Sequence, residues 1–408
     1  AQRSPEAIRE EMPEVDAIMG VNDYQKLDQA IQEAAKGGRP VYTDDDGRFH
    51  EFGRVLTTPK YSAYIRIGEG CDNWCSYCAI PMIRGGYRSR PKADILAEVR
   101  TLAAQGVKEF TLIAQDTTRY GTDDGGESQL PQLIEEIAAI PGVEWLRVLY
   151  CYPDEIDEEL LNAMARHDNI CKYLDLPLQH ADPLLLKRMN RRGDPEKTRQ
   201  LLHRAREMGF TLRTTFIVGF PGETDEQFAH LMDFVREIQF DRLGAFPYSP
   251  EEDTPAARMD GQIPEELKQK RLDELMTAQQ TFSLERNRLR IGTEEKVLVE
   301  TVDGKGHGVG RSAQEAPDTD GVIKLTGVSG AYWKNNKDNK MLTRINGVAF
   351  RNQEELDAWE KEQQEARERD HRKIGKEMGL FMTDDLVGRG LPMFLPAGYT
   401  VWQELENY

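Results

Sequence analysis

The chain has 408 residues, a formal charge of −18 and 39% hydrophobic residues. A chain of this length is expected to form about two to four domains. Its acidity argues against a broad nucleic-acid surface, because phosphate binding draws on clustered lysine and arginine, and it suits a basic protein partner better. With no signal peptide and no run of about 18 apolar residues, the sequence predicts a cytoplasmic protein without a membrane span.

The first 56 residues contain few structural elements. An apolar strand is expected at residues 15–19 and a helix at residues 23–35, which ends at the glycine pair 37–38. These elements are too few to make a domain. We therefore expect residues 1–56 to be a piece of one.

Three of the five cysteines are clustered after the next apolar strand, residues 63–67. Cys71, Cys75 and Cys78 have a C-x3-C-x2-C spacing, and five cysteines in so long a chain indicate cofactor ligands in a reducing compartment rather than disulfides. A [4Fe-4S] cluster takes four thiolates when it is fully bound by protein. Three thiolates therefore predict a cluster with one iron open to a small molecule.

Two other interpretations of these cysteines are a zinc site and part of a disulfide framework. Zinc needs a fourth Cys or His at short range, whereas the next candidates, Cys151, His167 and Cys171, are distant in the sequence. Cys151 and Cys171 are more typical of small core residues than of ligands.

Between Tyr61 and Phe246, apolar strands alternate with amphipathic helices, which predicts a parallel β/α structure. The expected strands are residues 63–67, 109–113, 145–149, 172–176, 211–218 and 242–246. The expected helices are residues 92–104, 130–140, 157–166, 195–208 and 225–238. Because closed β/α barrels carry their chemistry at the carboxyl ends of the strands, the residues that follow these strands are the site candidates.

The second, fourth and fifth strands are followed by candidate binding residues: Gln115 and Asp116, Gln179 and His180, and the glycines Gly219 and Gly222. The two glycines permit positive φ and a close approach of the backbone, as a small cofactor against a strand end needs. The same GFPGE segment also suits a tight turn before the following helix.

Two further polar residues have open roles. Arg213 is expected inside the fifth strand, where a buried guanidinium needs an anion, either the carboxylate of a cofactor or a structural Asp or Glu. His180 is either a hydrogen-bonding group at a strand end or a substrate contact. No catalytic residue is assigned.

The C-terminal third begins with a helical pattern at residues 264–290, followed by short strands in residues 295–325 around a glycine-rich turn. Residues 291–327 hold seven acidic and four basic residues, a net charge of −3, which suits a basic partner or a solvated surface. A charged helix is expected at residues 354–376 and carries no chemistry of its own.

The cysteine spacing, with Tyr77 before the third cysteine, resembles the signature of radical S-adenosylmethionine (SAM) enzymes. In that family the open iron chelates the amino and carboxylate groups of SAM, and reduction of the cluster yields a 5′-deoxyadenosyl radical. The resemblance implies a partial, six-unit barrel, SAM contacts at Tyr77, Gln115, Asp116, Gln179, Arg213, Gly219 and Gly222, and an electron donor such as flavodoxin or ferredoxin.

A narrower resemblance is to the methylthiotransferases. It is carried by the segments CAIPMIRGGYRSRP, LIAQDTTRYG, YCYPDEI, LDLPLQHADPLLLKRMNRR and FIVGFPGETDEQF. Within that group the chain resembles the RimO-type enzymes, which methylthiolate the β-carbon of an aspartate in small-subunit ribosomal protein twelve. The tRNA-modifying branch is expected to read differently at residues 114–118 and 179–182.

The resemblance also implies a domain plan. It gives a truncated N-terminal methylthiotransferase domain (1–56), a radical SAM domain (57–286), a partial TRAM β-barrel (287–327) and an α+β segment resembling threonyl-tRNA synthetase (328–408). In the family the N-terminal domain binds a second [4Fe-4S] cluster, but no cysteine precedes Cys71 here, so impaired activity is expected. Because the two resemblances meet near residues 324–326 and each is cut within a domain, a chimeric chain is expected. The rivals are a tRNA methylthiotransferase, a non-catalytic iron–sulfur protein, and a tRNA-binding or aminoacylation module in the tail.

Overall fold

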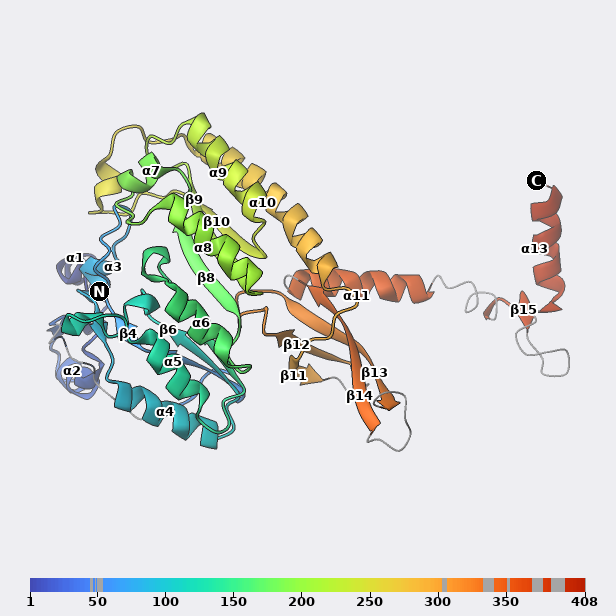
Figure 1. The fold of residues 1–408 in the computed structure, drawn as a ribbon, viewed down its shortest axis with the longest axis horizontal. Coiled ribbons are helices and arrows are strands. Elements are labelled where there is room, and N and C mark those ends of the chain that lie inside the picture. Colours follow the sequence, from blue (N-terminus) through green and yellow to red (C-terminus); the bar gives the residue numbers. More distant parts are fainter. Residues whose placement is uncertain are drawn as a thin grey trace. The chain divides into compact units, whose positions relative to one another are not determined.

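The structure is a computed structural model, and it describes residues 1–44, 47, 49, 54–302, 307–332, 341–350, 353–368, 377–382 and 393–407 (Figure 1). The chain divides into two compact units, Ala1–Glu295 and Lys296–Tyr408. Every candidate site residue lies in the first unit. None of the helices in the described part of the chain is long and apolar enough to cross a membrane.

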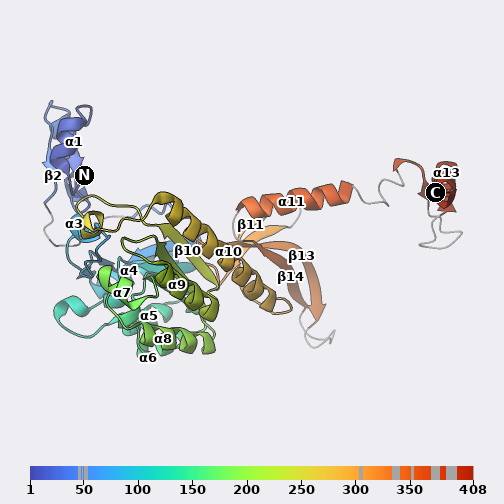
Figure 2. The ribbon, with the colours of Figure 1, turned by 90° about the horizontal axis from the view of Figure 1, so that it is seen from above.

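The N-terminal segment forms a small α/β element. It contains α1 (Pro5–Glu11), β1 (Ile18–Met19), the 3-10 helix η1 (Tyr24–Lys26), α2 (Leu27–Ala34) and β2 (Val41–Tyr42). β1 and β2 pair in parallel, and Gln2 holds their ends by donating to Thr43 O and accepting from Val21 N. The expected strand and helix are present, and Figure 2 shows this segment near α3 (Ile80–Arg84).

Six parallel strands form the centre of the first unit. They are β3 (Ser62–Arg66), β6 (Glu109–Ile113), β7 (Trp145–Val148), β8 (Tyr173–Gln179), β9 (Thr211–Val218) and β10 (Arg242–Pro247). The first three pair in the order β3-β6-β7 and the last three in the order β8-β9-β10. A parallel bridge between Leu146 and Ile170 links the two sheets. All six expected strands are therefore present and in parallel pairing.

Helices alternate with these strands, as the hydrophobic pattern predicts. They are α4 (Lys92–Ala104), α5 (Leu130–Ala138), α6 (Glu158–Arg166), α7 (Pro183–Arg188), α8 (Pro195–Glu207), α9 (Asp225–Ile238) and α10 (Glu265–Leu289). Short 3-10 helices lie at Thr117–Arg119, Thr122–Asp124, Pro153–Glu155 and Pro255–Arg258. Asp157 caps α6, and Thr224 and Gln227 form a capping box on α9, which fixes where these helices begin.

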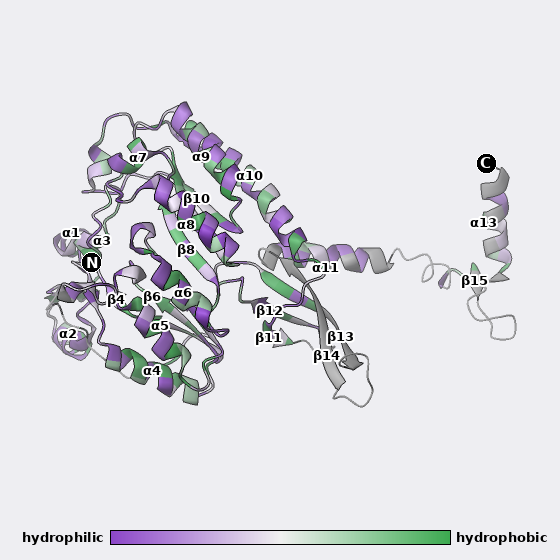
Figure 3. Cartoon of the chain, in the orientation of Figure 1, coloured by the Kyte–Doolittle hydropathy of each residue, from purple (hydrophilic) through white to green (hydrophobic). Residues whose placement is uncertain are grey.

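The core lies between the strands and the helices. Apolar side chains such as Ile65, Phe110, Leu146 and Phe216 are fully buried, and Figure 3 shows hydrophobic colour along the strands and both hydrophobic and hydrophilic colour on the helices around them. Burial of apolar area at about 25 cal/mol per Å² holds the scaffold together. The loops at the carboxyl ends of the strands are thereby placed on a rigid support.

The second unit contains an antiparallel sheet in the order β11-β12-β13-β14. Its strands are β11 (Val297–Val302), β12 (Gly308–Ser312), β13 (Val322–Tyr332) and β14 (Met341–Phe350). The remaining elements are α11 (Gln353–Glu368), β15 (Phe381–Met382), β16 (Met393–Phe394) and α13 (Pro396–Asn407). The short strands expected within residues 295–325 are present, but β13 continues past residue 327 and pairs with β14. The expected helix 354–376 is described only to Glu368.

Candidate functional site

The cysteine loop lies between β4 (Gly68–Glu69) and α3, while β4 pairs with β5 (Arg88–Ser89) beyond it. Cys71 N donates to Gly85 O over 3.1 Å and Ser76 N donates to Met189 O over 2.9 Å. Ser76 O in turn accepts from Ala256 N at 2.8 Å. The backbone of the loop is therefore held by the nearby Gly85 and by two segments far away in the sequence, which fixes where the thiols lie.

The three cysteines form a neighbouring set of thiols. Cys75 is buried, and Cys71 and Cys78 are half-buried. Burial raises the pKa of Cys71 to about 11, with further contributions from the charges of Asp116, Cys75 and Cys78. Burial likewise raises the pKa of Cys78. Such thiols remain protonated in the free protein, whereas metal coordination deprotonates a thiol outright.

This arrangement fits a cluster held by three cysteines. Within the described residues, no three His, Cys, Asp or Glu side chains converge closely enough to hold one metal ion. A [4Fe-4S] cluster does not need that convergence, because each thiolate binds a different iron. Arg191 adds a cation, with its Nη1 at 3.8 Å from Cys75 Sγ. The donor set thus suits an iron–sulfur cluster.

Tyr77 lies against an aromatic group next to the loop. Its ring centroid is 6.4 Å from that of Phe220, in an edge-to-face arrangement, and Phe220 meets Tyr248 in the same way at 5.3 Å. Phe220 and Tyr248 are buried beside Met189. Tyr77 therefore sits on a fixed apolar support, and its contact with SAM stays a prediction.

Gln115 and Asp116 both hold the cysteine loop from the end of β6. Gln115 Oε1 accepts from Gly70 N at 2.7 Å. Asp116 is buried and accepts from Asn73 Nδ2 at 2.9 Å and from the Thr118 hydroxyl, while burial raises its pKa. Their expected SAM contact is untested, but their loop-holding role follows directly from these hydrogen bonds.

Arg213 has a structural anion as its partner. Its Nη1 lies 2.6 Å from Asp175 Oδ1. Asp175 is buried, and its Oδ2 accepts from Tyr150 N at 2.9 Å. Of the two roles expected for Arg213, the pair with a structural carboxylate is the one present, and a SAM contact stays a prediction.

Gly219 and Gly222 have positive φ values of 70° and 79°. A Cβ on Gly219 would lie 2.3 Å from Lys268 Cγ, and one on Gly222 would lie 2.9 Å from Arg188. The expected close approach is therefore made by side chains of this chain. Glu223 closes the turn by accepting from Gly219 N at 2.5 Å, so the tight-turn interpretation describes this segment, and SAM contact stays a prediction.

Gln179 is the last residue of β8, and His180 follows it. Gln179 has a positive φ of 71°. His180 is buried, and its Nδ1 accepts from Asp182 N at 3.0 Å, which leaves the ring proton on Nε2. No hydrogen-bond partner of Nε2 is found among the described residues. Burial lowers the pKa of His180 to about 3, so the ring is neutral near pH 7.

This burial predicts a pH-dependent stability. The pKa of His180 is lower in the folded chain than its ordinary value of about 6.5, so the unfolded chain binds the extra proton and stability falls as the pH drops below 6.5. Between pH 7 and pH 5 the loss from this group is about 2 kcal/mol. In His180→Asn, whose Oδ1 still accepts from Asp182 N, that part of the loss should disappear. Urea unfolding of the iron-free chain at both pH values measures it.

His203→Asn is the matched control, because the side chain of His203 lies on α8 and is 52% exposed. It should keep the pH dependence of the wild type. An equal pH dependence in wild type and His180→Asn would contradict the assignment.

The sequence reasoning missed a group of strained residues around the cysteine loop. Trp74, Tyr150 and Asn190 have positive φ values of 48°, 61° and 53°, which is uncommon for residues other than glycine. Asn190 Nδ2 donates to Trp74 O over 2.7 Å. Such strain is concentrated at functional sites. No spacing rule in the sequence reveals these backbone angles.

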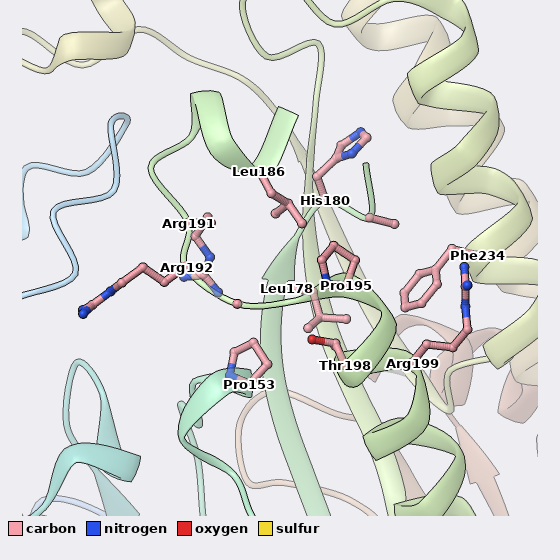
Figure 4. A pocket seen from close by; sticks show the side chains of 12 residues that line it. Pro153, Leu178, His180, Leu186, Arg191, Arg192, Pro195, Thr198, Arg199 and Phe234 are labelled. Carbon is pink, nitrogen blue, oxygen red and sulfur yellow. The ribbon is translucent and has the colours of Figure 1, made fainter. Parts of the chain in front are cut away.

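A small pocket lies beside the loop (Figure 4). The hollow has about 440 Å³ of empty space, which includes open solvent, and its lining includes His180, Arg191, Arg192, Thr198 and Phe234. Arg192 reaches toward the cysteine loop, where its Nη2 donates to Asn73 Oδ1 over 2.6 Å. Arg191 and Arg192 end the segment LDLPLQHADPLLLKRMNRR quoted above, but the sequence alone predicted no partner for either of them.

Comparison with known families defines the class of protein. Residues 65–235 match the Radical SAM superfamily, and residues 291–341 match the TRAM domain. The chain is therefore a radical SAM protein that also carries a TRAM domain.

Curated relatives narrow the assignment. Ribosomal protein uS12 methylthiotransferase RimO from Clostridium tetani is 46% identical over 327 residues, which cover 79% of this chain and 73% of the relative. RimO from Pelotomaculum thermopropionicum is 47% identical over 329 residues, which cover 79% of this chain and 74% of that relative. The chain belongs to the RimO family of methylthiotransferases. It is an enzyme family whose radical SAM domain implies a [4Fe-4S] cluster and SAM.

Two solved structures were also compared. Coproporphyrinogen III oxidase (HemN) from Escherichia coli is 18% identical with a TM-score of 0.43, covering 72% of each chain. The methyltransferase TsrM from Kitasatospora setae is 24% identical with a TM-score of 0.41, covering 48% of this chain and 38% of that one. Both scores are below 0.5, so the family assignment rests on the relatives and the family matches.

Proposed function

We propose that the SAM site of this chain serves the addition of a methylthio group to the β-carbon of an aspartate in ribosomal protein uS12, a transfer that these 408 residues with their five cysteines should perform slowly by themselves. The observation that carries the proposal is the cysteine loop, Cys71, Cys75 and Cys78, held at the carboxyl ends of parallel strands in a chain about 47% identical to RimO enzymes. A cluster with an open iron, SAM and an electron supply the radical that attacks an unactivated C–H bond.

The residues of the chain position these groups. The three cysteines hold the cluster, while Gln115 and Asp116 fix the loop on which they lie. The proposed SAM-contacting residues are Tyr77, Gln115, Asp116, Gln179, Arg213, Gly219 and Gly222. Since Gln115, Asp116 and Arg213 already bond within the chain, their effect on SAM is expected to act mainly through the shape of the site.

A basic ribosomal protein is the proposed acceptor, and the charge of −18 supports it. A cytoplasmic location and a small electron-donor protein such as flavodoxin or ferredoxin complete the proposal. tRNA is the alternative acceptor, disfavoured by the acidity and by the sequence at residues 114–118.

The domain plan is proposed with the boundaries 1–56, 57–286, 287–327 and 328–408. Within it, the radical SAM domain is a partial six-unit barrel and the tail is a segment similar to threonyl-tRNA synthetase. No candidate site residue lies after Glu295, so we assign no part of the SAM chemistry to the tail.

Anaerobic reconstitution tests this function. With one cubane, iron analysis should give about four irons per chain, and the reduced chain should release 5′-deoxyadenosine from SAM. A chain that ends at Glu295 should keep both properties, because it retains the whole first unit. The result that contradicts the proposal is a wild-type chain that binds no iron or that does not cleave SAM. Mass spectrometry of uS12 and of tRNA then distinguishes the two acceptors.

A further inference from the structure

Arg191 is placed between the cysteine loop and the end of β8. Its Nη1 lies 3.8 Å from Cys75 Sγ, and its Nη2 donates to Pro177 O over 2.7 Å. Its guanidinium carbon lies 4.0 Å from the centroid of the Tyr152 ring. Three contacts on three sides therefore hold the guanidinium against one of the cluster-binding sulfurs.

Arg191 differs from the other interior arginines in its partner. Arg213 pairs with Asp175, Arg271 with Glu223 and Arg147 with Glu109. Arg191 forms no ion pair with an aspartate or glutamate within the described ranges, although its charge opposes the rise that desolvation causes in the pKa of Asp154. Its close side-chain neighbours are instead Cys75 and the ring of Tyr152.

A half-buried cation without an anion is costly, because it loses part of its hydration and gains no counter-charge in return. Cys75 Sγ becomes an anion once it binds iron. The position of Arg191 is thus explained if its counter-anion is the thiolate-bound cluster, which supplies negative charge at the place where the guanidinium points.

We infer that Arg191 is the counter-cation of the cluster and raises its reduction potential. This inference rests on the proposed function, because it needs the cluster. Reduction adds one negative charge, and a fixed positive charge and a hydrogen bond at a ligand sulfur stabilise the reduced form more than the oxidised form. Arg191 is a positioning residue that acts through Cys75, and it makes the reduction that precedes SAM cleavage easier.

The geometry requires the guanidinium and not merely a charge. Its planar fork reaches Cys75 with one nitrogen and Pro177 with the other, while its face stacks on Tyr152. A lysine ammonium is a point charge on a flexible stem and cannot make these three contacts together. Arg191→Lys should therefore give part of the wild-type effect, and Arg191→Met none.

The test is an EPR-monitored redox titration of the full chain, reconstituted with iron and sulfide and reduced with dithionite, without SAM. At the potential where half of the wild-type cluster is reduced, Arg191→Met should show a ratio of reduced to oxidised cluster that is about tenfold lower. For this one-electron couple, that ratio corresponds to a midpoint potential about 59 mV more negative. Arg191→Lys should lie between. Arg204→Met is the control for net charge, because Arg204 is 47% exposed and pairs with Glu158, and its midpoint should equal that of the wild type.

The outcomes separate the inference from the proposed function. A wild-type chain without iron overturns both. Full iron content with equal midpoints in wild type and Arg191→Met overturns the role of Arg191 alone. If Arg191→Met does not assemble a cluster, Arg191→Gln, whose amide still donates to Pro177 O, replaces it. If neither neutral variant assembles one, Arg191→Lys decides: a midpoint equal to the wild type overturns the inference, and a lower one supports it.

Discussion

Cys75→Ala should abolish iron binding and SAM cleavage together. Cys75 is the buried member of the three cysteines and lies next to Arg191, so its loss leaves two thiolates and an unpaired guanidinium in the same place. Two thiolates hold a cubane poorly. We expect the iron content of the reconstituted variant to fall at least tenfold, with 5′-deoxyadenosine below detection. Iron analysis and product chromatography measure both.

Cys171→Ala is the matched control. Cys171 is also buried, with 2% exposure, but lies before β8 and away from the loop. Removing one sulfur from a packed site should cost about 1 kcal/mol of stability, like other small deletions in a core, and should leave the iron content unchanged. A normal cluster spectrum and SAM turnover in Cys75→Ala would overturn the assignment of the loop.

The sequence predicted the scaffold because its signals are local. The six strands carry short apolar runs, and the helices between them repeat their buried positions at helical spacing. The cysteine loop was likewise visible, since its three thiols lie within eight residues. Local signals therefore predicted the class of fold, and they also led to the three cysteines as metal ligands, which stays a prediction.

The supports of the site escaped the sequence because they join distant residues. Arg191 meets Cys75 across 116 positions, and Asn73 meets Asp116 across 43. No spacing in one sequence reveals such pairs. Arg213 shows the same limit: its need for an anion was predictable from burial, whereas the choice of Asp175 depends on the parallel register of β8 and β9.

The two glycines that follow the fifth strand, Gly219 and Gly222, illustrate the same point. Their positive φ was predictable from residue type, but the neighbours that approach them were not. Lys268 and Arg188 come from α10 and α7, and only the packing of these helices brings them there.

A polypeptide of these 408 residues should cleave SAM without transferring a methylthio group at a useful rate. The resemblance implies a second [4Fe-4S] cluster that delivers the sulfur, and such a cluster would need its own thiolates. The 408 residues hold five cysteines, and the two outside the loop, Cys151 and Cys171, are buried at 0% and 2% exposure. Two buried thiols are too few and too enclosed to bind a second cubane.

The measurement is mass spectrometry of uS12 after incubation with reduced chain and SAM, while 5′-deoxyadenosine is followed in the same samples. We expect 5′-deoxyadenosine to accumulate with at least a hundredfold fewer methylthio adducts than with RimO from Clostridium tetani, the positive control. Iron analysis should give about four irons per chain rather than about eight. Adducts formed at the rate of the control would mean that sulfur reaches the site without a second cluster on these residues. Eight irons would mean that Cys151, Cys171 or other side chains bind one, because the fold opens where the structure shows it closed.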